Sequence, residues 1–238
     1  MSASVFVLYG FEHILTLMIL LACWIGIPFF FTKASKPAQD KMAIGLGAAL
    51  IFHEINQVFN AFIIGLPWQE ALPFHMCDMS ALAIATYLLS GQRLFFLLAY
   101  FWGLGGAVMA VLQPDLAYGF PHPAFMPYFS GHGLIVLAVL YACAVMGARP
   151  YLKDVAWVIK ISLILMVGIY ILNIVLGEGA NFWYLKRHPA SDSLMNFFPT
   201  PPWHIGALIP LAVVVFYASY TPYVLLDWRQ KKRAKKEV

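Results

Sequence analysis

Charged residues are scarce in this chain: only 11% of its 238 residues are charged, whereas 62% are hydrophobic. A soluble domain is typically about 45–50% apolar and about 25% charged, and a soluble fold of this length must still cover its surface with polar groups. The composition therefore excludes a soluble globular domain, a disordered chain, a secreted disulfide scaffold and a nucleic-acid-binding domain. It leaves a multi-pass membrane protein, in agreement with a mean hydropathy of +0.77.

Cysteine and paired metal-binding motifs are also scarce. The three cysteines, Cys23, Cys77 and Cys143, include no CxxC pair and so indicate neither a disulfide framework nor a zinc knuckle. The seven histidines form no HxxxH or HExxH pair. A metal site would therefore need ligands from several helices and stays open, while no cofactor is indicated.

Long apolar stretches dominate what is present. A helix needs about 20 mainly apolar residues to cross the hydrocarbon core, and seven stretches qualify, the third being the shortest. The first has no basic residue before it and no A-x-A site after it, so we expect a retained helix rather than a cleaved signal peptide. We predict an all-α bundle of seven transmembrane helices that forms one domain over residues 1–238, with spans at about 9–31, 42–65, 76–91, 94–113, 129–147, 155–177 and 203–226.

The basic residues predict the orientation of these spans. Cytoplasmic loops of membrane proteins are enriched in Lys and Arg. Twelve of the fifteen basic residues fall on one side, six of them in the tail 229–238, whereas only Lys186 and Arg187 fall on the other. The sequence therefore predicts an N-terminus outside and a basic, cytoplasmic C-terminal tail that lies against anionic lipid headgroups.

The second span carries an unusual stripe of polar residues. His53, Asn56, Gln57 and Asn60 fall within about 100° on a helical wheel, with Glu54 at the margin. Polar groups inside a membrane are costly, so we expect this stripe to face the bundle interior. It either lines a functional cavity that binds substrate or supplies hydrogen bonds between helices.

The third span begins with His75, Cys77 and Asp78. Free N–H groups and the helix dipole stabilise an anion at a helix N-terminus, and a cysteine there beside a histidine can act as a nucleophile. Alternatively, Cys77 is a small buried residue and Asp78 caps the helix.

The predicted orientation places this first turn at the outer end of its span, and further polar residues are predicted at the same outer face. Asp115 follows the fourth span, and His132 lies between Gly131 and Gly133 in the fifth, where there is room for a ligand. Asn181 and His204 complete the candidate substrate-binding set. The small residues of the fourth span, Gly103–Ala110, indicate close helix packing.

Four sequence blocks resemble the YwaF-like bacterial integral membrane proteins, which are similar to the eukaryotic transmembrane protein 164 group. These blocks are LPFHMCD (72–78), GLGGAVMAVLQPDL (103–116), YGFPHPAFMPYFSGHGLIVLAVLY (118–141) and NFWYLKRHP with PPWHI (181–205). The resemblance implies acyl transfer onto ether phospholipids, with the required family cysteine matching Cys77. A more distant similarity to androgen-induced membrane hydrolases, which use Thr and His, would pair Cys77 with His132. Gln113 departs from the Thr expected before Pro-Asp-Leu.

Three functions stay open. The first is a lipid acyltransferase or lipid ester hydrolase of the bacterial cytoplasmic membrane, acting on membrane lipids at the outer-leaflet headgroups. In it Cys77 is the nucleophile, His132 the base, Asp115 or Asp78 the orienting acid and His75 a second candidate base. The second is a small-molecule transporter or channel that uses the polar stripe of the second span, although no internal repeat is evident. The third is a seven-helix ligand sensor. The oligomeric state is not indicated.

Overall fold

The computed structural model describes residues 4–189 and 194–234, and within these ranges the chain is helical and has no strand beyond one isolated bridge between Val5 and Tyr118. Residues 235–238 of the predicted tail lie outside the described residues. The elements are α1 (Phe11–Thr32), α2 (Lys36–Ile63), α3 (Met76–Ser90), α4 (Arg93–Trp102), η1 (Gly103–Ala107), α5 (Val108–Leu112), α6 (Phe125–Ala144), α7 (Leu152–Val175), η2 (Phe182–Tyr184), η3 (Leu194–Phe197) and α8 (Ile205–Ala234).

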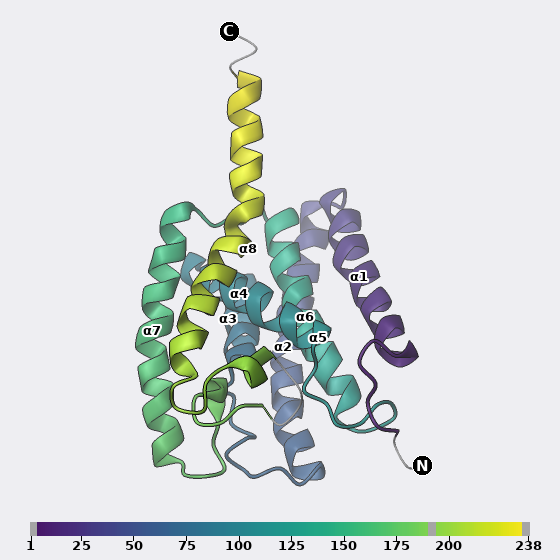
Figure 1. The fold of residues 1–238 in the computed structure, drawn as a ribbon. Helices are drawn as coiled ribbons and strands as arrows, with labels where there is room; N and C mark the ends of the chain where they lie inside the picture. Colours follow the sequence, from purple (N-terminus) through teal and green to yellow (C-terminus); the bar gives the residue numbers. More distant parts are fainter. Residues whose placement is uncertain (1–3, 190–193, 235–238) are drawn as a thin grey trace.

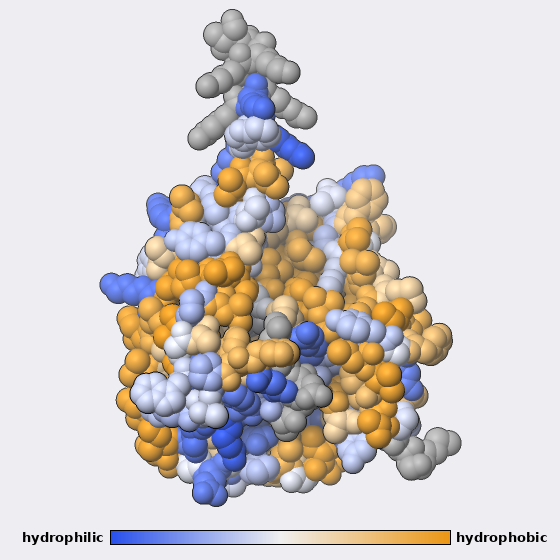
Figure 2. Space-filling view, viewed as in Figure 1, coloured by the Kyte–Doolittle hydropathy of each residue, from blue (hydrophilic) through white to orange (hydrophobic). Residues whose placement is uncertain are grey.

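The long helices give this chain the character of a helical membrane protein. Six helices of the described chain are long and apolar enough to cross a membrane, with α4, η1 and α5 counted as one, whereas α3 has only 15 residues. Each predicted span coincides with one helix, but α2 begins at Lys36 and α8 continues to Ala234. The end of α8 projects away from the bundle (Figure 1). Figure 2 shows apolar side chains over most of the visible flanks and hydrophilic ones near η2 and on the projecting end of α8.

The short helix α3 lies at the centre of the bundle, packed against α2, α4 and α6. Small and branched apolar residues make up its middle, so Ala81, Ile84 and Ala85 are buried by the surrounding helices. It ends at Gly91, whose φ of +71° is a left-handed conformation that glycine adopts without steric cost.

The fourth helix contains a π-helical segment, η1, at its glycines. A β-carbon on Gly103 would approach Ile135 of α6 to 2.9 Å, and one on Gly105 would approach Val215 of α8 to 2.9 Å. The predicted close packing is therefore present. The π geometry is additional, and π segments occur frequently at functional sites.

Two ion pairs join helices at the end of the bundle remote from η2. Arg93 of α4 donates to both carboxylate oxygens of Asp154 on α7, and Arg149 donates to Asp227 on α8. Both guanidinium groups lie about 5 Å from the ring of Tyr151. Paired carboxylates and stacked Arg side chains thus hold α4, α7 and α8 together there.

The segment around η2 covers the beginning of α3. The buried side-chain amide of Asn173 on α7 donates to the carbonyl of Phe182 and accepts from its N–H. The indole of Trp183 donates to the carbonyl of Phe74, just before α3. Trp183 and Tyr184 both have φ above +50°, a conformation costly for non-glycine residues that these contacts hold in place.

Candidate functional site

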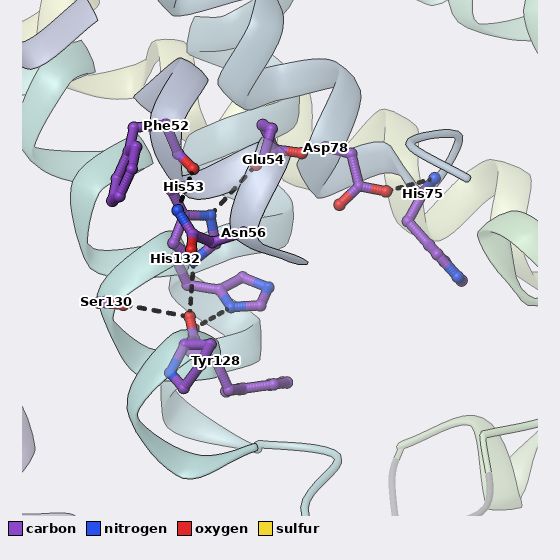
Figure 3. Close-up of polar contacts among 10 residues, drawn as sticks. Phe52, His53, Glu54, Asn56, His75, Asp78, Tyr128, Ser130 and His132 are labelled. Atoms are coloured by element: carbon purple, nitrogen blue, oxygen red, sulfur yellow. Dashed lines mark hydrogen bonds and ion pairs between the residues drawn. The ribbon is translucent and has the colours of Figure 1, made fainter. Parts of the chain in front are cut away.

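A cavity of about 20 Å³ lies between α2, α3 and α6, with room for roughly one water molecule. It brings together the polar stripe of the second span and side chains from two of the sequence blocks quoted above. Figure 3 shows His53 and Glu54 beside His132, with Asp78 facing them from α3. The residues that line the cavity are His53, Glu54, Gln57, Cys77, Asp78, Pro127, Gly131, His132 and Ile135.

The polar stripe of α2 and the Cys77–His132 cluster therefore share one cavity. The sequence alone did not indicate whether these two sets of residues meet. The η2 segment covers the start of α3, and Cys77 in the first turn of that helix lies inside the bundle, beside the residues of α2.

Two glycines of α6 allow this convergence. A β-carbon on Gly131 would lie 2.6 Å from Nε2 of His53, and one on Gly133 would collide with Leu20 of α1. The carbonyl of Gly133 also accepts a hydrogen bond from the indole of Trp24 on α1. The Gly-His-Gly sequence thus lets α1 and α2 approach α6 on either side of His132.

The hydrogen bonds of His132 determine which of its nitrogens can act as a base. Nδ1 lies 2.7 Å from the carbonyl oxygen of Tyr128. A carbonyl only accepts, so Nδ1 carries the hydrogen and Nε2 of the neutral ring holds the lone pair. Since the ring lines the cavity, His132 offers a proton acceptor there, and its orientation comes from a backbone carbonyl rather than from the predicted Asp115 or Asp78.

The hydrogen-bond partners of the His53 ring likewise indicate the roles of its two nitrogens. Nε2 of His53 donates to the carbonyl of Pro127 at 2.9 Å, and Nδ1 lies 3.4 Å from Oε1 of Glu54. Their side chains are only 12% and 10% exposed. When the ring is protonated, Nδ1 can donate to the carboxylate of Glu54.

Cys77 and Asp78 are placed by the first turn of α3. A carboxylate oxygen of Asp78 accepts a hydrogen bond from the backbone N–H of His75 at 2.9 Å. Asp78 therefore caps the helix, which is one of the two roles considered for it from the sequence. The sulfur of Cys77 lies 3.8 Å from the position of a β-carbon on Gly106, so the absence of a side chain there keeps space open between the thiol and η1.

Asp115 and His75 lie outside the cavity lining, in a layer beneath η2. The hydroxyl of Tyr184 donates to Asp115, whose N–H donates to the hydroxyl of Tyr128. The ring of His75 packs on Phe182 and lies 6.1 Å from the ring of Tyr184. Burial lowers the pKa of His75 to about 4, although Asp115 opposes the shift.

Four of the predicted substrate-binding residues do not line the cavity. Asn56 is exposed and its amide donates to the carbonyl of Phe52 in its own helix, so the expectation that it faces the interior is wrong. Asn60 is half-buried farther along α2. Asn181 forms a turn by accepting the N–H groups of Lys186 and Arg187, and buried His204 bonds to the carbonyl of Tyr184.

Sequence reasoning did not select Tyr128 or Tyr184. Tyr128 precedes His132 by four residues and therefore shares its helix face, with ring centroids 4.4 Å apart. This spacing could have identified Tyr128, whereas nothing in the local sequence marks the contact between Tyr184 and Asp115.

Within residues 4–189 and 194–234, no group of three or more His, Cys, Asp or Glu side chains is arranged to hold a metal ion. All three cysteines are free thiols.

Comparison with known proteins gives two similarities. The model of the TMEM164 family matches residues 8–220. An uncharacterised protein of Treponema pallidum (strain Nichols) is 25% identical over 227 residues, which cover 93% of this chain and 92% of that protein. No solved structure matches the chain. The resemblance to the transmembrane protein 164 group is thereby confirmed.

Proposed function

This chain belongs to the TMEM164 family, and we propose that it is an integral membrane lipid acyltransferase or lipid ester hydrolase. The observation that carries the proposal is the shared cavity, in which the thiol of Cys77 and the imidazole of His132 come from different helices and face the same space. A thiol with a nearby proton acceptor is the arrangement used for nucleophilic acyl transfer.

In the proposed reaction, the sulfur of Cys77 attacks the carbonyl carbon of an acyl ester while Nε2 of His132 takes the thiol proton. The ester C–O bond then breaks, the leaving alcohol receives that proton, and the acyl group remains on Cys77 as a thioester. A second hydroxyl, from an acceptor lipid or from water, gives its proton to His132 and attacks the thioester, which restores the thiol.

The covering segment has a role in this proposal. A cavity of about 20 Å³ does not admit a lipid ester, so substrate entry requires displacement of the η2 segment or of a neighbouring helix. Tyr184 links η2 to Asp115, and Asp115 in turn contacts Tyr128, which orients His132. In this proposal, Asp115 and His75 help to position the η2 segment, and Asp115 also helps to position His132 through Tyr128. Neither residue lines the cavity that contains the thiol.

The topology belongs to the same proposal. Seven spans with the N-terminus outside and a basic cytoplasmic tail would place η2 and the entrance to the cavity toward the outer leaflet of the bacterial cytoplasmic membrane. Support comes from the distribution of basic residues, twelve of which fall on the opposite side. Membrane phospholipids would be the substrates.

Acyl transfer by purified protein in lipid vesicles tests the proposal. We expect Cys77→Ala to abolish turnover of a phospholipid labelled in its acyl chain, because no thioester can form. Cys143→Ala is the matched control, since Cys143 is also a half-buried thiol but does not line the cavity. Equal turnover by the two variants would disprove the nucleophile assignment.

The contact between His53 and Glu54 inside the bundle favours a second candidate, transport of a small solute. Both side chains line the cavity, and an ionisable pair inside a membrane is a frequent part of transport pathways. Uptake into liposomes by wild type and Glu54→Gln separates the candidates. Uptake that is lost in Glu54→Gln, together with acyl turnover that never exceeds the protein-free rate, would favour transport.

A further inference from the structure

A second hollow lies on the flank of the bundle, between α7 and the beginning of α8. It has a volume of about 190 Å³ and its lining is apolar throughout. Met166, Val167 and Tyr170 of α7 form one wall, and Leu185 and Ile205 form the rest. Val167 is 57% exposed whereas Leu185 is buried, so this groove opens sideways from a buried floor.

The surroundings of the groove are hydrocarbon. Both α7 and α8 are long and apolar enough to cross a membrane. On α7 the groove spans Met166 to Tyr170, about one helical turn or about 6 Å, beginning nine residues before the end of that helix. Apolar walls in a bilayer gain dispersion energy only when other atoms fill the space between them, and lipid chains are the atoms available there.

The seam between α7 and α8 is closed at its other end. Arg149, which precedes α7, is paired with Asp227 of α8 and stacks on the ring of Tyr223. The hydroxyl of Tyr100 on α4 also donates to the carbonyl of Ser219 on α8. These contacts hold α8 to the segment before α7 and to α4, and the groove lies toward the opposite end of the seam, where Ile205 begins α8.

The rim of the groove suits the polar part of a phospholipid. Arg187 follows Leu185 by two residues, so its Cα lies within about 7 Å of the floor. Its side chain is exposed and uses one N–H for the carbonyl of Glu178, and a guanidinium has five such donors. Trp203, two residues before Ile205, is 76% exposed, and tryptophan is enriched at the level of lipid headgroups.

We propose that this groove binds one acyl chain of a membrane phospholipid, with the lipid phosphate at Arg187. The apolar groove suits an acyl chain, and the exposed guanidinium and tryptophan, each two residues from a lining residue, suit a phosphate and a headgroup region. The site is separate from the cavity of Cys77 and does not depend on acyl transfer there.

Photolabelling of the full chain tests this site. The protein is reconstituted in phosphatidylcholine vesicles that contain a phosphatidylglycerol with a diazirine midway along one acyl chain, and labelled peptides are identified by mass spectrometry. We expect labelling at Met166–Tyr170 and Leu185 to saturate as the probe increases and to be displaced by unlabelled phosphatidylglycerol. Labelling that rises linearly and spreads evenly over exposed residues of α7 would overturn the proposal.

Matched variants sharpen the test. Val167→Trp fills the groove from its exposed wall and should reduce groove labelling several-fold, whereas Ile164→Trp, on the same helix and exposed but outside the lining, should leave it unchanged. Arg187→Gln should weaken displacement by phosphatidylglycerol. Equal labelling of the two tryptophan variants, or cross-links from the groove to a second copy of the protein, would overturn the proposal. Cys77→Ala should label like wild type, so a failure of the acyl-transfer proposal would leave this result unaffected.

Discussion

The imidazole of His53 lies directly over the α-carbon of Gly131. A β-carbon at position 131 would come within 2.6 Å of Nε2 of His53, the atom that bonds to the carbonyl of Pro127. The contact fixes the separation of α2 and α6 at the depth where His132 enters the cavity. Its geometry leads to the first of four predictions.

Gly131→Ala should displace the ring of His53 and destabilise the protein by about 1–3 kcal/mol, because a methyl group is forced into a packed contact. The midpoint of thermal unfolding in detergent measures this effect. Gly168→Ala is the control: its β-carbon meets no atom within 4 Å, so this variant should be neutral or slightly more stable. A normal midpoint for Gly131→Ala would contradict the described approach of α2 to α6.

His132→Asn should separate the orienting role of the side chain from its role as a base. The Asn amide can donate to the carbonyl of Tyr128 as Nδ1 does, but it provides no lone pair at the position of Nε2. We expect near-normal thermal stability with acyl turnover reduced by about 10²–10⁴-fold. Turnover close to wild type in this variant would exclude His132 as the base.

The positions of the helices could be predicted from the sequence because a bilayer demands about 20 apolar residues for each crossing. The π geometry of Gly103–Ala107 could not, since the same glycines are equally compatible with a regular packed helix. The position of the start of α3 within the bundle could not be predicted from the sequence either. It depends on the segment around Trp183, which folds over Phe74 through a contact 109 residues apart in the chain.

The site could be predicted in part. His53, Glu54 and Gln57 were identified because polar residues inside a span are costly, and they do line the cavity. Asn56 was misplaced because a helical wheel gives angles but not which neighbours cover them. Tyr184 was not identified because its contact with Asp115 depends on the left-handed backbone conformation of Trp183 and Tyr184, which no local sequence pattern predicts.

His75 should contribute a pH dependence to stability. Its pKa is lowered by burial from 6.5 to about 4, so between these values the unfolded chain binds more protons than the folded protein. Stability is therefore full above pH 6.5 and falls as the pH decreases toward 4, by about 2–3 kcal/mol at most. His75→Phe keeps the aromatic packing on Phe182 but cannot titrate, and its unfolding midpoint should fall less over this range. Parallel pH profiles for the two proteins would refute the assignment.

Asp154→Asn should destabilise the end of the bundle remote from η2 by about 2 kcal/mol. Asp154 is only 3% exposed, is paired with Arg93 and accepts the N–H of Tyr151, so its loss weakens three hydrogen bonds. Asp40→Asn, in an exposed pair with Lys36, should change stability by less than about 1 kcal/mol. Thermal unfolding compares the two variants, and equal midpoints would show that the buried pair adds nothing.

The π-helical segment η1 makes the length of the fourth helix matter as much as its composition. A π turn accommodates one residue more than an α turn, and one residue changes the angular position along a helix by about 100°. Asp115 follows three residues after the helix that contains this π turn, and it accepts a hydrogen bond from the hydroxyl of Tyr184. Removal of one residue there should restore a regular helix and rotate the segment that carries Asp115 relative to η2. Along this stretch, an insertion or a deletion should therefore disturb the site as much as a substitution.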